Sequence, residues 1–408
     1  MKNRIYSIDR IIEVGIYLYI IFMFLSKGES IRNILLFTIF FLWLLTFKER
    51  KNKNILTDSI SLFFGAFIIS IVISSIFSID KWYSISELQK DPLKSVLLFP
   101  VISTTLTNEK KLIRLTYVFF VVLLLTLSVS YYSYWALNLP IMKPDIPLMH
   151  QWHNRFAIFL NTLMPFSFIL LLYNKRLINK VGIAAALAAG IVALALSTSR
   201  GGIASFLLMF IIWAIYFLKK KKVSVKPILG AFAVAIIILG VAAFYAKPEI
   251  KDRFLDIKND IKTLNYRTVI WKPLIYAAKE KPILGWGYGT EIFRSDEPFK
   301  KTPFKVSPVK MGHGFRRPDS IFMSILFHQG ITGLILYLLL LIVAIKTFWE
   351  EAFSTQRLQS YILIACTSVL ISTYGLHSMI ENTRLFYLTL ILGVGLAAKN
   401  CKNEDSHS

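Results

Sequence analysis

Charged residues are scarce in this chain. They make up 17% of its 408 residues, whereas 55% of the residues are hydrophobic. A soluble domain is usually about a quarter charged. The apolar residues are gathered into blocks of roughly membrane-spanning length. These observations exclude an ordinary soluble domain and predict an all-α polytopic integral membrane protein.

Cysteines and acidic residues are also few. Cys366 lies in an apolar segment and Cys401 in the C-terminal tail, so we expect no disulfide. The 47 Lys/Arg against 24 Asp/Glu suggest nucleic acid at first. A polytopic protein, however, concentrates Lys/Arg in cytoplasmic loops, so we expect no nucleic-acid partner. No His/Cys/Asp/Glu set has metal-ligand spacing, and we expect neither a bound metal nor another cofactor.

The apolar blocks predict about twelve membrane-spanning helices. They cover residues 11–26, 33–47, 55–78, 95–107, 112–138, 156–173, 181–197, 203–218, 227–246, 321–345, 360–378 and 385–398. With a cytoplasmic N-terminus, the cytoplasmic segments carry 22 Lys/Arg and the short outer loops carry nine. This asymmetry follows the positive-inside rule and places both termini in the cytoplasm.

One long polar run interrupts the apolar pattern, from Lys247 to Ser320. It divides the chain into helices over 1–246, a large outer loop over 247–320, and further helices with a tail over 321–408. The loop has 16 Lys/Arg against 9 Asp/Glu. Long loops are exempt from the positive-inside rule, so the excess of cations indicates either a surface drawn to anionic lipids or a site for an anionic substrate.

Structure is expected inside this loop, because loops longer than about 15 residues are usually structured or functional. Residues 267–279 have apolar side chains at helical spacing, which predicts a short helix on the membrane face. Pro282 and the glycines at 285, 287 and 289 predict a turn after it. Residues 320–329 predict a short helix that ends at Gly330, before the span proper.

Arg200 stands between two apolar spans, beside Gly201 and Gly202. A cation close to the hydrocarbon is costly and often marks a substrate path or a paired charge. The alternative is a snorkelling arginine at a helix end. The glycines and neighbouring hydroxyls favour a closely packed site.

The outer loop holds the other candidate residues. Trp286 and Tyr288 lie in a Gly-Trp-Gly-Tyr-Gly run, which is expected to expose two aromatic faces suited to stacking on sugars. Arg316 and Arg317 match diphosphate oxygens, because a guanidinium is planar and bidentate. Asp319 or His313 is placed to act as a general base. The alternative is an ordinary charged flank of a membrane span.

Three motifs together resemble the O-antigen ligase / O-antigen polymerase superfamily of bacterial envelope glycosyltransferases. The first is a Thr-Ser-Arg-Gly-Gly element between two spans. The second is Arg-x-x-x-Trp followed by the glycine run, and the third is Pro-Asp-Ser-Ile-Phe leading to Gly-Ile-Thr-Gly-Leu. In order, they occupy Thr198–Gly202, Arg267–Trp271 with Pro282–Gly289, and Pro318–Phe322 with Gly330–Leu334.

The resemblance implies a reaction at the periplasmic face of the bacterial inner membrane. A glycan on undecaprenyl diphosphate is transferred to an acceptor, which in ligases is the lipid A core of lipopolysaccharide. The transfer is inverting and metal-independent. Arg200 and Arg267 would then bind the diphosphate and stabilise its departure, with Trp271, Trp286 and Tyr288 near the substrates.

The chain departs from the family at one position. The family usually has a His followed by Asn or Ser where this chain has Asp319-Ser320. Asp319 or His313 is therefore the expected base, unless this member has lost the activity. The basic loop and the Trp and Gly motifs favour a ligase over a polymerase. A multi-pass lipid or sugar transporter is the alternative from another class.

Overall fold

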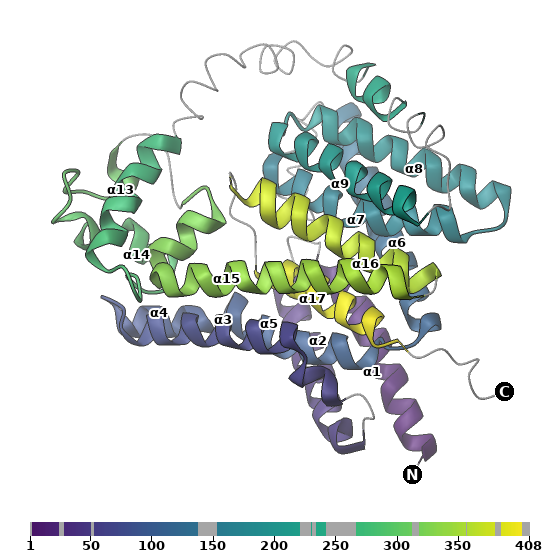
Figure 1. Cartoon of the computed structure of the whole chain (residues 1–408), viewed down its shortest axis with the longest axis horizontal. Coiled ribbons are helices and arrows are strands. Elements are labelled where there is room, and N and C mark those ends of the chain that lie inside the picture. The colour runs from purple at the N-terminus through teal and green to yellow at the C-terminus, as the bar shows by residue number, and fades with distance from the viewer. Residues whose placement is uncertain are drawn as a thin grey trace.

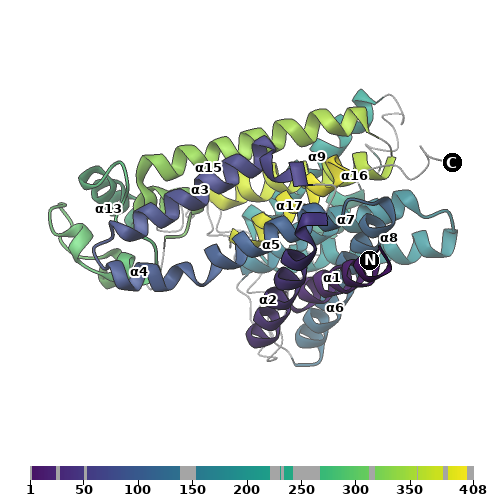
Figure 2. The same ribbon diagram turned by 90° about the horizontal axis from the view of Figure 1, so that it is seen from below.

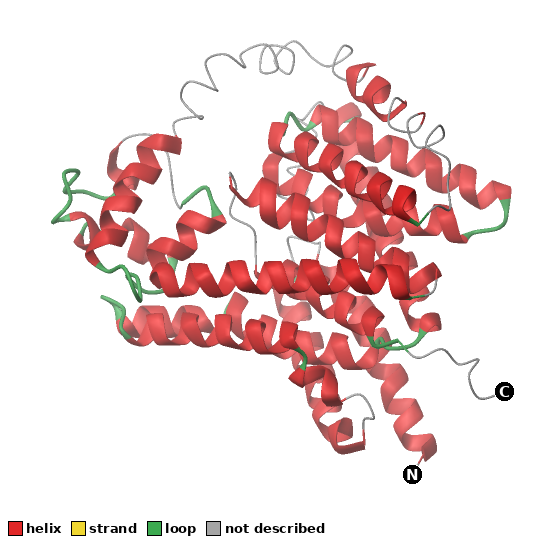
Figure 3. Ribbon diagram, viewed as in Figure 1, coloured by secondary structure: helices red, strands yellow, loops and turns green. Residues whose placement is uncertain are grey.

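The computed structural model describes residues 2–23, 28–49, 53–137, 153–220, 230, 234–241, 267–311, 318–355, 357–379 and 385–401. Within these residues the regular structure is entirely helical (Figure 3). The chain begins with α1 (Lys2–Met23), α2 (Glu29–Thr46), α3 (Ser59–Ile76), α4 (Lys81–Leu88), α5 (Asp91–Thr105), α6 (Glu109–Trp135), α7 (His153–Tyr173), α8 (Leu177–Leu196) and α9 (Arg200–Lys219). It continues with α13 (Arg267–Glu280), α14 (Thr290–Arg294), α15 (Ile321–Ser354), α16 (Arg357–Val369) and α17 (Leu385–Lys399).

The described residues also form short helices of other types. The 3-10 helices are η1 (Phe47–Glu49), η2 (Lys53–Thr57), η3 (Glu297–Phe299), η4 (Pro308–Met311) and η6 (His377–Met379). The segment η5 (Leu370–Leu376) is a π-helix that continues α16. The predicted loop helix over 267–279 is confirmed as α13.

Eight of the described helical segments are long and apolar enough to cross a membrane. They correspond to eight of the twelve predicted spans, so the polytopic helical class is confirmed. Three other predicted spans are helices that are too charged or too short to meet these requirements of length and composition. The helix α1 carries several charges, and α5 and α17 have 15 residues each. Of the predicted span at 227–246, the structure describes only residue 230 and the helical residues 234–241.

The two short helices lie inside the bundle. The helix α17 packs along α5, and Gly393 of α17 faces Ile102 of α5 so closely that an added Cβ would stand 3.1 Å from its side chain. Nearly every residue of α17 from Phe386 to Ala398 is buried. A helix surrounded by protein on all sides need not match the full thickness of the bilayer.

Polar contacts join chain segments that the topology prediction assigns to one side of the membrane. On the side predicted to be cytoplasmic, Lys111 pairs with Asp9 at 3.1 Å, and Lys399 pairs with Asp58. On the opposite side Lys94 pairs with Glu29 at 2.8 Å. The relative placement of the loops therefore agrees with the prediction.

The helix α15 organises the molecule. It runs across the full width of the bundle and packs along α3 (Figures 1 and 2). Residues 267–311, which we call the loop lobe, lie at one end of α15 beside α4, and α8 lies toward the other end (Figures 1 and 2). The lobe has its own apolar core, which contains Ile270, Leu274, Ala277, Trp286, Ile292, Phe293 and Phe299, together with Phe327 of α15.

Candidate functional site

A break in α15 holds the loop lobe in place. Gly330 has the non-helical dihedral angles φ 66° and ψ −164°, which confirms the predicted interruption at this residue. In an unbroken helix the carbonyls of Phe327 and His328 would accept the amides four residues later. Here the amides of Trp286 and Gly287 donate to them instead, both at 3.0 Å.

The exchange of hydrogen bonds is mutual. The amide of Ile331 donates to the carbonyl of Pro282 at 2.7 Å, and the hydroxyl of Thr332 donates to the carbonyl of Ile283. The ring of His328 is buried, with Nδ1 2.7 Å from the carbonyl oxygen of Gly287. Buried backbone groups need such hydrogen-bond partners. The backbone groups at the break in α15 and those of residues 282–287 provide them for one another. We call this arrangement the glycine clasp (residues 282–287 with 327–332).

Glycine is required in the clasp because the two backbones touch. A Cβ on Gly285 would stand 2.5 Å from the carbonyl carbon of His328, and one on Gly330 would stand 2.4 Å from the oxygen of Ile283. Gly285, Gly287 and Gly289 all have positive φ, at 68°, 107° and 125°. The turn predicted from the glycine spacing is confirmed, with close backbone approach added to it.

The segment from α3 to α4 covers the other side of the same loop. The hydroxyl of Ser78 donates to the carbonyl of Trp286 at 3.2 Å. The amide of Glu291 donates to the hydroxyl of Tyr83 at 3.1 Å. An added Cβ on Gly289 would lie 2.6 Å from the Tyr83 ring. The contribution of α4 was missed from the sequence, because no local pattern connects residues about 200 positions apart.

The burial of Trp286 corrects the expectation that its ring faces outward. Trp286 is only 8% exposed, and its indole N–H donates to the carbonyl of Ala277 at 2.7 Å. The ammonium of Lys281 lies 4.6 Å from its ring centroid. Trp286 is thus an anchor of the lobe core and offers no free ring face to a sugar. Tyr288 is half-buried, and burial raises the pKa of its hydroxyl.

The Arg200 motif forms the turn between α8 and α9. Thr198 has a φ of 56°, a conformation that costs a non-glycine residue roughly 1–2 kcal/mol and often occurs at functional sites. The hydroxyl of Ser199 accepts the amide of Gly202 at 3.2 Å and so caps α9. Arg200 is the first residue of that helix and is half-buried.

The helix α7 approaches this turn very closely. The side-chain amide of Asn161 donates to the carbonyl of Gly202 at 2.8 Å, and the hydroxyl of Ser199 donates to Asn154 at 2.8 Å. A Cβ on Gly202 would lie 2.3 Å from the Cβ of Ala157. The expected packed, close-approach site around Arg200 is therefore present.

The irregular end of α16 joins the Arg200 motif to the Asp319 motif. The segments η5 and η6 both pack against α9, and the hydroxyl of Ser205 donates to the carbonyl of Ser372 at 2.8 Å. On the other side, the hydroxyl of Ser320 lies 3.5 Å from the carbonyl of Ser378. The helix α9, which begins at Arg200, and the start of α15 at Ser320 therefore contact one buried polar segment, although they are more than 100 residues apart in the chain.

This polar segment, residues 370–379, was not singled out from the sequence. Its signal was present as an unusual density of Ser, Thr and Gly inside an apolar span, over Ser372, Thr373, Gly375 and Ser378. A π-helix widens the turn and leaves carbonyls available to partners outside the helix, and such turns are frequent at functional sites. The side chain of His377 is also buried in this segment.

The remaining predicted residues lie at helix starts or outside the described residues. Arg267 is the first residue of α13, and Trp271 follows one helical turn later, half-buried at the edge of the lobe core. Asp319 is half-buried and directly precedes Ser320, whose hydroxyl accepts the amide of Met323 at 3.4 Å and caps α15. His313, Arg316 and Arg317 fall outside the described residues.

Among the residues that the structure describes, no three or more His, Cys, Asp or Glu side chains are grouped so that they could hold a metal ion. Both cysteines are free thiols, with Cys366 buried and Cys401 half-buried. The chemically versatile groups of the described site are therefore guanidinium, carboxylate, hydroxyl and helix N-termini, which suit the binding of an anion and the movement of a proton.

A comparison with known protein families matches the part of the chain that contains these motifs. Residues 184–338 match a family model described as O-antigen ligase. The matched part contains the Arg200 turn, α9, α13, the glycine clasp and the first half of α15. None of the curated proteins matches the chain. The family groups glycosyltransferase-like enzymes, and over residues 184–338, which are less than half of its length, this chain is similar to the O-antigen ligase family.

Proposed function

We propose that the protein is an O-antigen ligase of the bacterial inner membrane. It transfers a glycan from undecaprenyl diphosphate to the lipid A core of lipopolysaccharide at the periplasmic face. The observation that carries the proposal is the convergence of α9, the helix that begins at Arg200, and the Asp319–Ser320 start of α15 on one buried polar segment, in a chain that matches the O-antigen ligase family over residues 184–338.

Arg200 and Arg267 bind the diphosphate of the donor. Each is the first residue of a helix, α9 and α13. The amide dipoles of a helix leave partial positive charge at this end, which adds to the charge of a guanidinium. Negative charge grows on the diphosphate as it leaves, so fixed cations at this point stabilise the transition state more than the ground state.

Asp319 or His313 takes the proton of the acceptor hydroxyl. The acceptor oxygen forms a bond to the anomeric carbon while the bond from that carbon to the diphosphate oxygen breaks. Undecaprenyl diphosphate leaves with the electron pair, and the proton passes to the base. Attack opposite to the leaving group inverts the anomeric centre. Asp319 suits this role because it directly precedes the capped start of α15, beside the polar segment.

The charges of the loop lobe favour an anionic acceptor. Residues 267–311 contain nine Lys/Arg and four Asp/Glu. Three of these acids pair within the lobe, as Glu291–Arg294, Glu297–Lys300 and Asp296–Lys310. Five lysines have no ion pair among the described residues: Lys272, Lys279, Lys281, Lys301 and Lys305. A phosphorylated lipopolysaccharide core would meet this surplus of positive charge.

Part of this charge surrounds an aromatic pair, of which Tyr276 is exposed and Phe304 half-buried. The rings of Tyr276 and Phe304 meet edge to face with centroids 5.9 Å apart, and the ammonium of Lys279 lies 5.4 Å from the Tyr276 ring centroid. Lys272 is four residues before Tyr276 on the same face of α13, and Lys305 follows Phe304. Cations beside an aromatic surface suit a sugar that carries a carboxylate or phosphate, and Arg316 and Arg317 follow in the same loop.

The first experiment compares lipopolysaccharide from a deletion strain with that from complemented strains. The complementing genes encode the wild type, Arg267→Ala, Asp319→Ala and the control Arg294→Ala, with the amount of each protein measured. Arg294 is the last residue of α14, and its side chain, which is 39% exposed, pairs with Glu291. We expect Arg267→Ala and Asp319→Ala to give at least tenfold less long glycan on the lipid A core than the wild type. Arg294→Ala should restore the wild-type amount.

The deletion itself separates the candidate functions. A ligase predicts glycan-free lipid A core together with accumulated polymerised glycan on the lipid carrier. Single repeat units attached to the core would instead identify a polymerase. Movement of a lipid-linked glycan across membrane vesicles by the purified protein, without any glycan transfer, would identify a transporter and contradict both enzymatic functions.

A further inference from the structure

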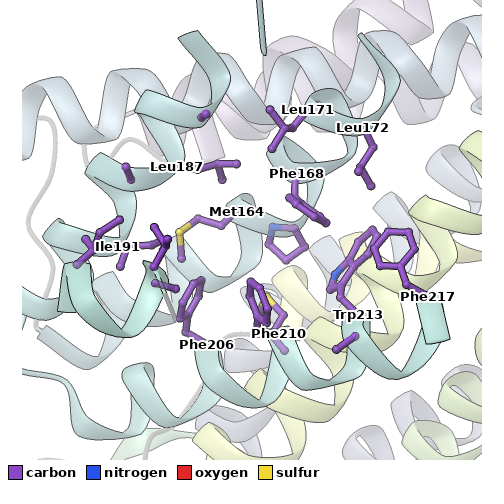
Figure 4. A pocket seen from close by; sticks show the side chains of 18 residues that line it. Met164, Phe168, Leu171, Leu172, Leu187, Ile191, Phe206, Phe210, Trp213 and Phe217 are labelled. Atoms are coloured by element: carbon purple, nitrogen blue, oxygen red, sulfur yellow. The ribbon is translucent and has the colours of Figure 1, made fainter. Parts of the chain in front are cut away.

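An apolar cavity lies among the membrane-spanning helices, away from the polar site. Its volume is about 470 Å³, and it is lined by α7, α8, α9 and the helical residues 234–238. Figure 4 shows Met164 and Phe168 of α7 facing Phe206, Phe210 and Trp213 of α9 across it. Sites for small molecules typically measure 300–1,000 Å³, so this volume is large enough for part of a lipid chain.

The lining is hydrocarbon and aromatic apart from one donor. The indole nitrogen of Trp213 is buried and has no hydrogen-bond partner among the described residues. Trp213 itself is 5% exposed, and its ring meets that of Phe168 edge to face at 5.0 Å. An apolar ligand fits these walls, and a carbon–carbon double bond would offer the indole N–H a weak π acceptor.

The cavity reaches the lipid-facing surface of the bundle. Leu172 and Val234 line it and are 36% and 55% exposed. In a membrane those surfaces face acyl chains. A chain can therefore enter sideways from the bilayer without crossing the polar site.

The cavity also lies along the helix that begins at Arg200. Phe206 and Phe217 follow Arg200 by six and 17 residues, or about 9 and 25 Å along α9 at 1.5 Å per residue. One leaflet supplies about half of a hydrocarbon core roughly 30 Å thick. A phospholipid acyl chain whose head group lies level with Arg200 therefore ends between Phe206 and Phe217. A longer polyprenyl chain continues to Phe217.

We propose that this cavity binds the polyprenyl chain of the lipid-linked donor and thereby selects donors by chain length. The inference rests on the proposed function, because it assumes a diphosphate bound at Arg200. The diphosphate is held at the start of α9, and the distal isoprene units enter the cavity between α7, α8 and α9. Shorter chains keep the diphosphate contacts but lose the burial of apolar surface in the cavity.

Photolabelling tests the binding site without any requirement for transfer. The probe is a C55 polyprenyl diphosphate without glycan that carries a diazirine near the distal end, added to the purified full chain in nanodiscs. We expect labelled peptides from residues 206–217, displaced by excess unlabelled C55 diphosphate and not by C10 diphosphate. Equal labelling by a diazirine phosphatidylglycerol, undiminished by C55 diphosphate, would mean that the cavity holds phospholipid and would overturn the proposal.

Two variants on α8 provide a matched pair. Ala188 lines the cavity, whereas Ala185 is exposed and does not line it. We expect Ala188→Phe to lower C55 labelling about tenfold and Ala185→Phe to leave it unchanged, with Ala214→Leu on α9 as a second cavity-filling change. Unchanged labelling in both filled variants would contradict the site, and the wild-type competition between C55 and C10 does not depend on any variant folding.

Transfer rates with C55 and C10 donors distinguish this inference from the proposed function. We expect the wild type to prefer the C55 donor at least tenfold in kcat/KM, and Ala188→Phe to lose most of that preference. Labelling of 206–217 without any glycan transfer would refute the ligase function and leave the lipid site standing. Glycan transfer with no dependence on chain length would refute the chain-length role.

Discussion

Single residues decide whether the loop lobe can attach to α15. Gly285 and Gly330 stand where two backbones cross, and each would place a Cβ within about 2.5 Å of the opposite chain. Gly285 also needs its φ of 68°, which a side chain disfavours. The residues at this crossing are therefore constrained by sterics before any role in binding is considered.

Replacing Gly285 by alanine tests this constraint. The added methyl group meets the backbone of His328, and such overpacking costs about 1–3 kcal/mol. We expect Gly285→Ala to lower the midpoint of thermal unfolding in detergent and to reduce transfer with it. Gly65→Ala in α3 is the control, since nothing lies within 4 Å of its Cβ position. Equal stability of the two variants would contradict the close approach.

Trp286 offers a second test at a single residue. Because its N–H donates to Ala277 inside the lobe core, Trp286→Phe removes a buried hydrogen bond worth about 1 kcal/mol and part of the ring. We expect lower thermal stability with an unchanged KM for the acceptor. A raised acceptor KM at unchanged stability would restore the sugar-stacking role that the sequence suggested.

At the scale of elements, short polar contacts give the loop lobe its shape. The carboxylate of Asp296 accepts the amide of Ser307 at 2.9 Å and pairs with Lys310. It therefore joins η3 to η4 across eleven residues of irregular chain. These contacts hold the pKa of Asp296 below the usual value of a carboxyl, chiefly through the hydrogen bond from Lys310 and then through the one from the amide of Ser307.

The lowered pKa predicts how the stability of the lobe depends on pH. A carboxyl with a depressed folded-state pKa stabilises the fold fully above its unfolded value and loses this contribution as the pH falls through the folded value. We expect Asp296→Asn to reduce thermal stability at pH 7 by up to about 1 kcal/mol, given the exposure of the pair. The difference from wild type should shrink as the pH falls below 3.8 and disappear once the pH is below the lowered pKa of the folded state. A difference that persists in acid would exclude the carboxylate charge as its cause.

At the scale of the whole molecule, the polar contacts divide the loops into two sets. Asp9 joins Lys111 and Asp58 joins Lys399 on one side, whereas Glu29 joins Lys94 on the other. The loop lobe belongs to the second side, where it contacts Ser78 and Tyr83. The charge asymmetry predicts that the first side is cytoplasmic.

Cysteine labelling tests this orientation. In a Cys366→Ser, Cys401→Ser background, single cysteines replace the exposed Lys305 of the lobe or the exposed Lys175 between α7 and α8. We expect an impermeant maleimide, applied to cells with a permeabilised outer membrane, to label Lys305→Cys at once. Lys175→Cys should be labelled only after the inner membrane is opened. The reverse pattern would invert the topology and place the proposed site in the cytoplasm.

Local sequence patterns determined the helical membrane class, eight of the long spans, the loop helix α13 and the break at Gly330. Each depends on hydropathy, helical spacing or glycine within a short window, and these act through neighbouring residues. The resemblance to the ligase family likewise rested on short motifs, and the match over residues 184–338 agrees with it.

Only the tertiary structure decided how these parts meet. Trp286 is buried because α13, α15 and the glycine loop close around it. The helix α9 and Ser320 meet at one polar segment because the π-helix η5 offers the carbonyl of Ser372 to Ser205 and the following 3-10 helix η6 offers that of Ser378 to Ser320. The short helices α5 and α17 pack along each other, and nearly all of α17 is covered by other parts of the protein. These outcomes depend on hydrogen bonds and packing between distant residues, which no local pattern encodes.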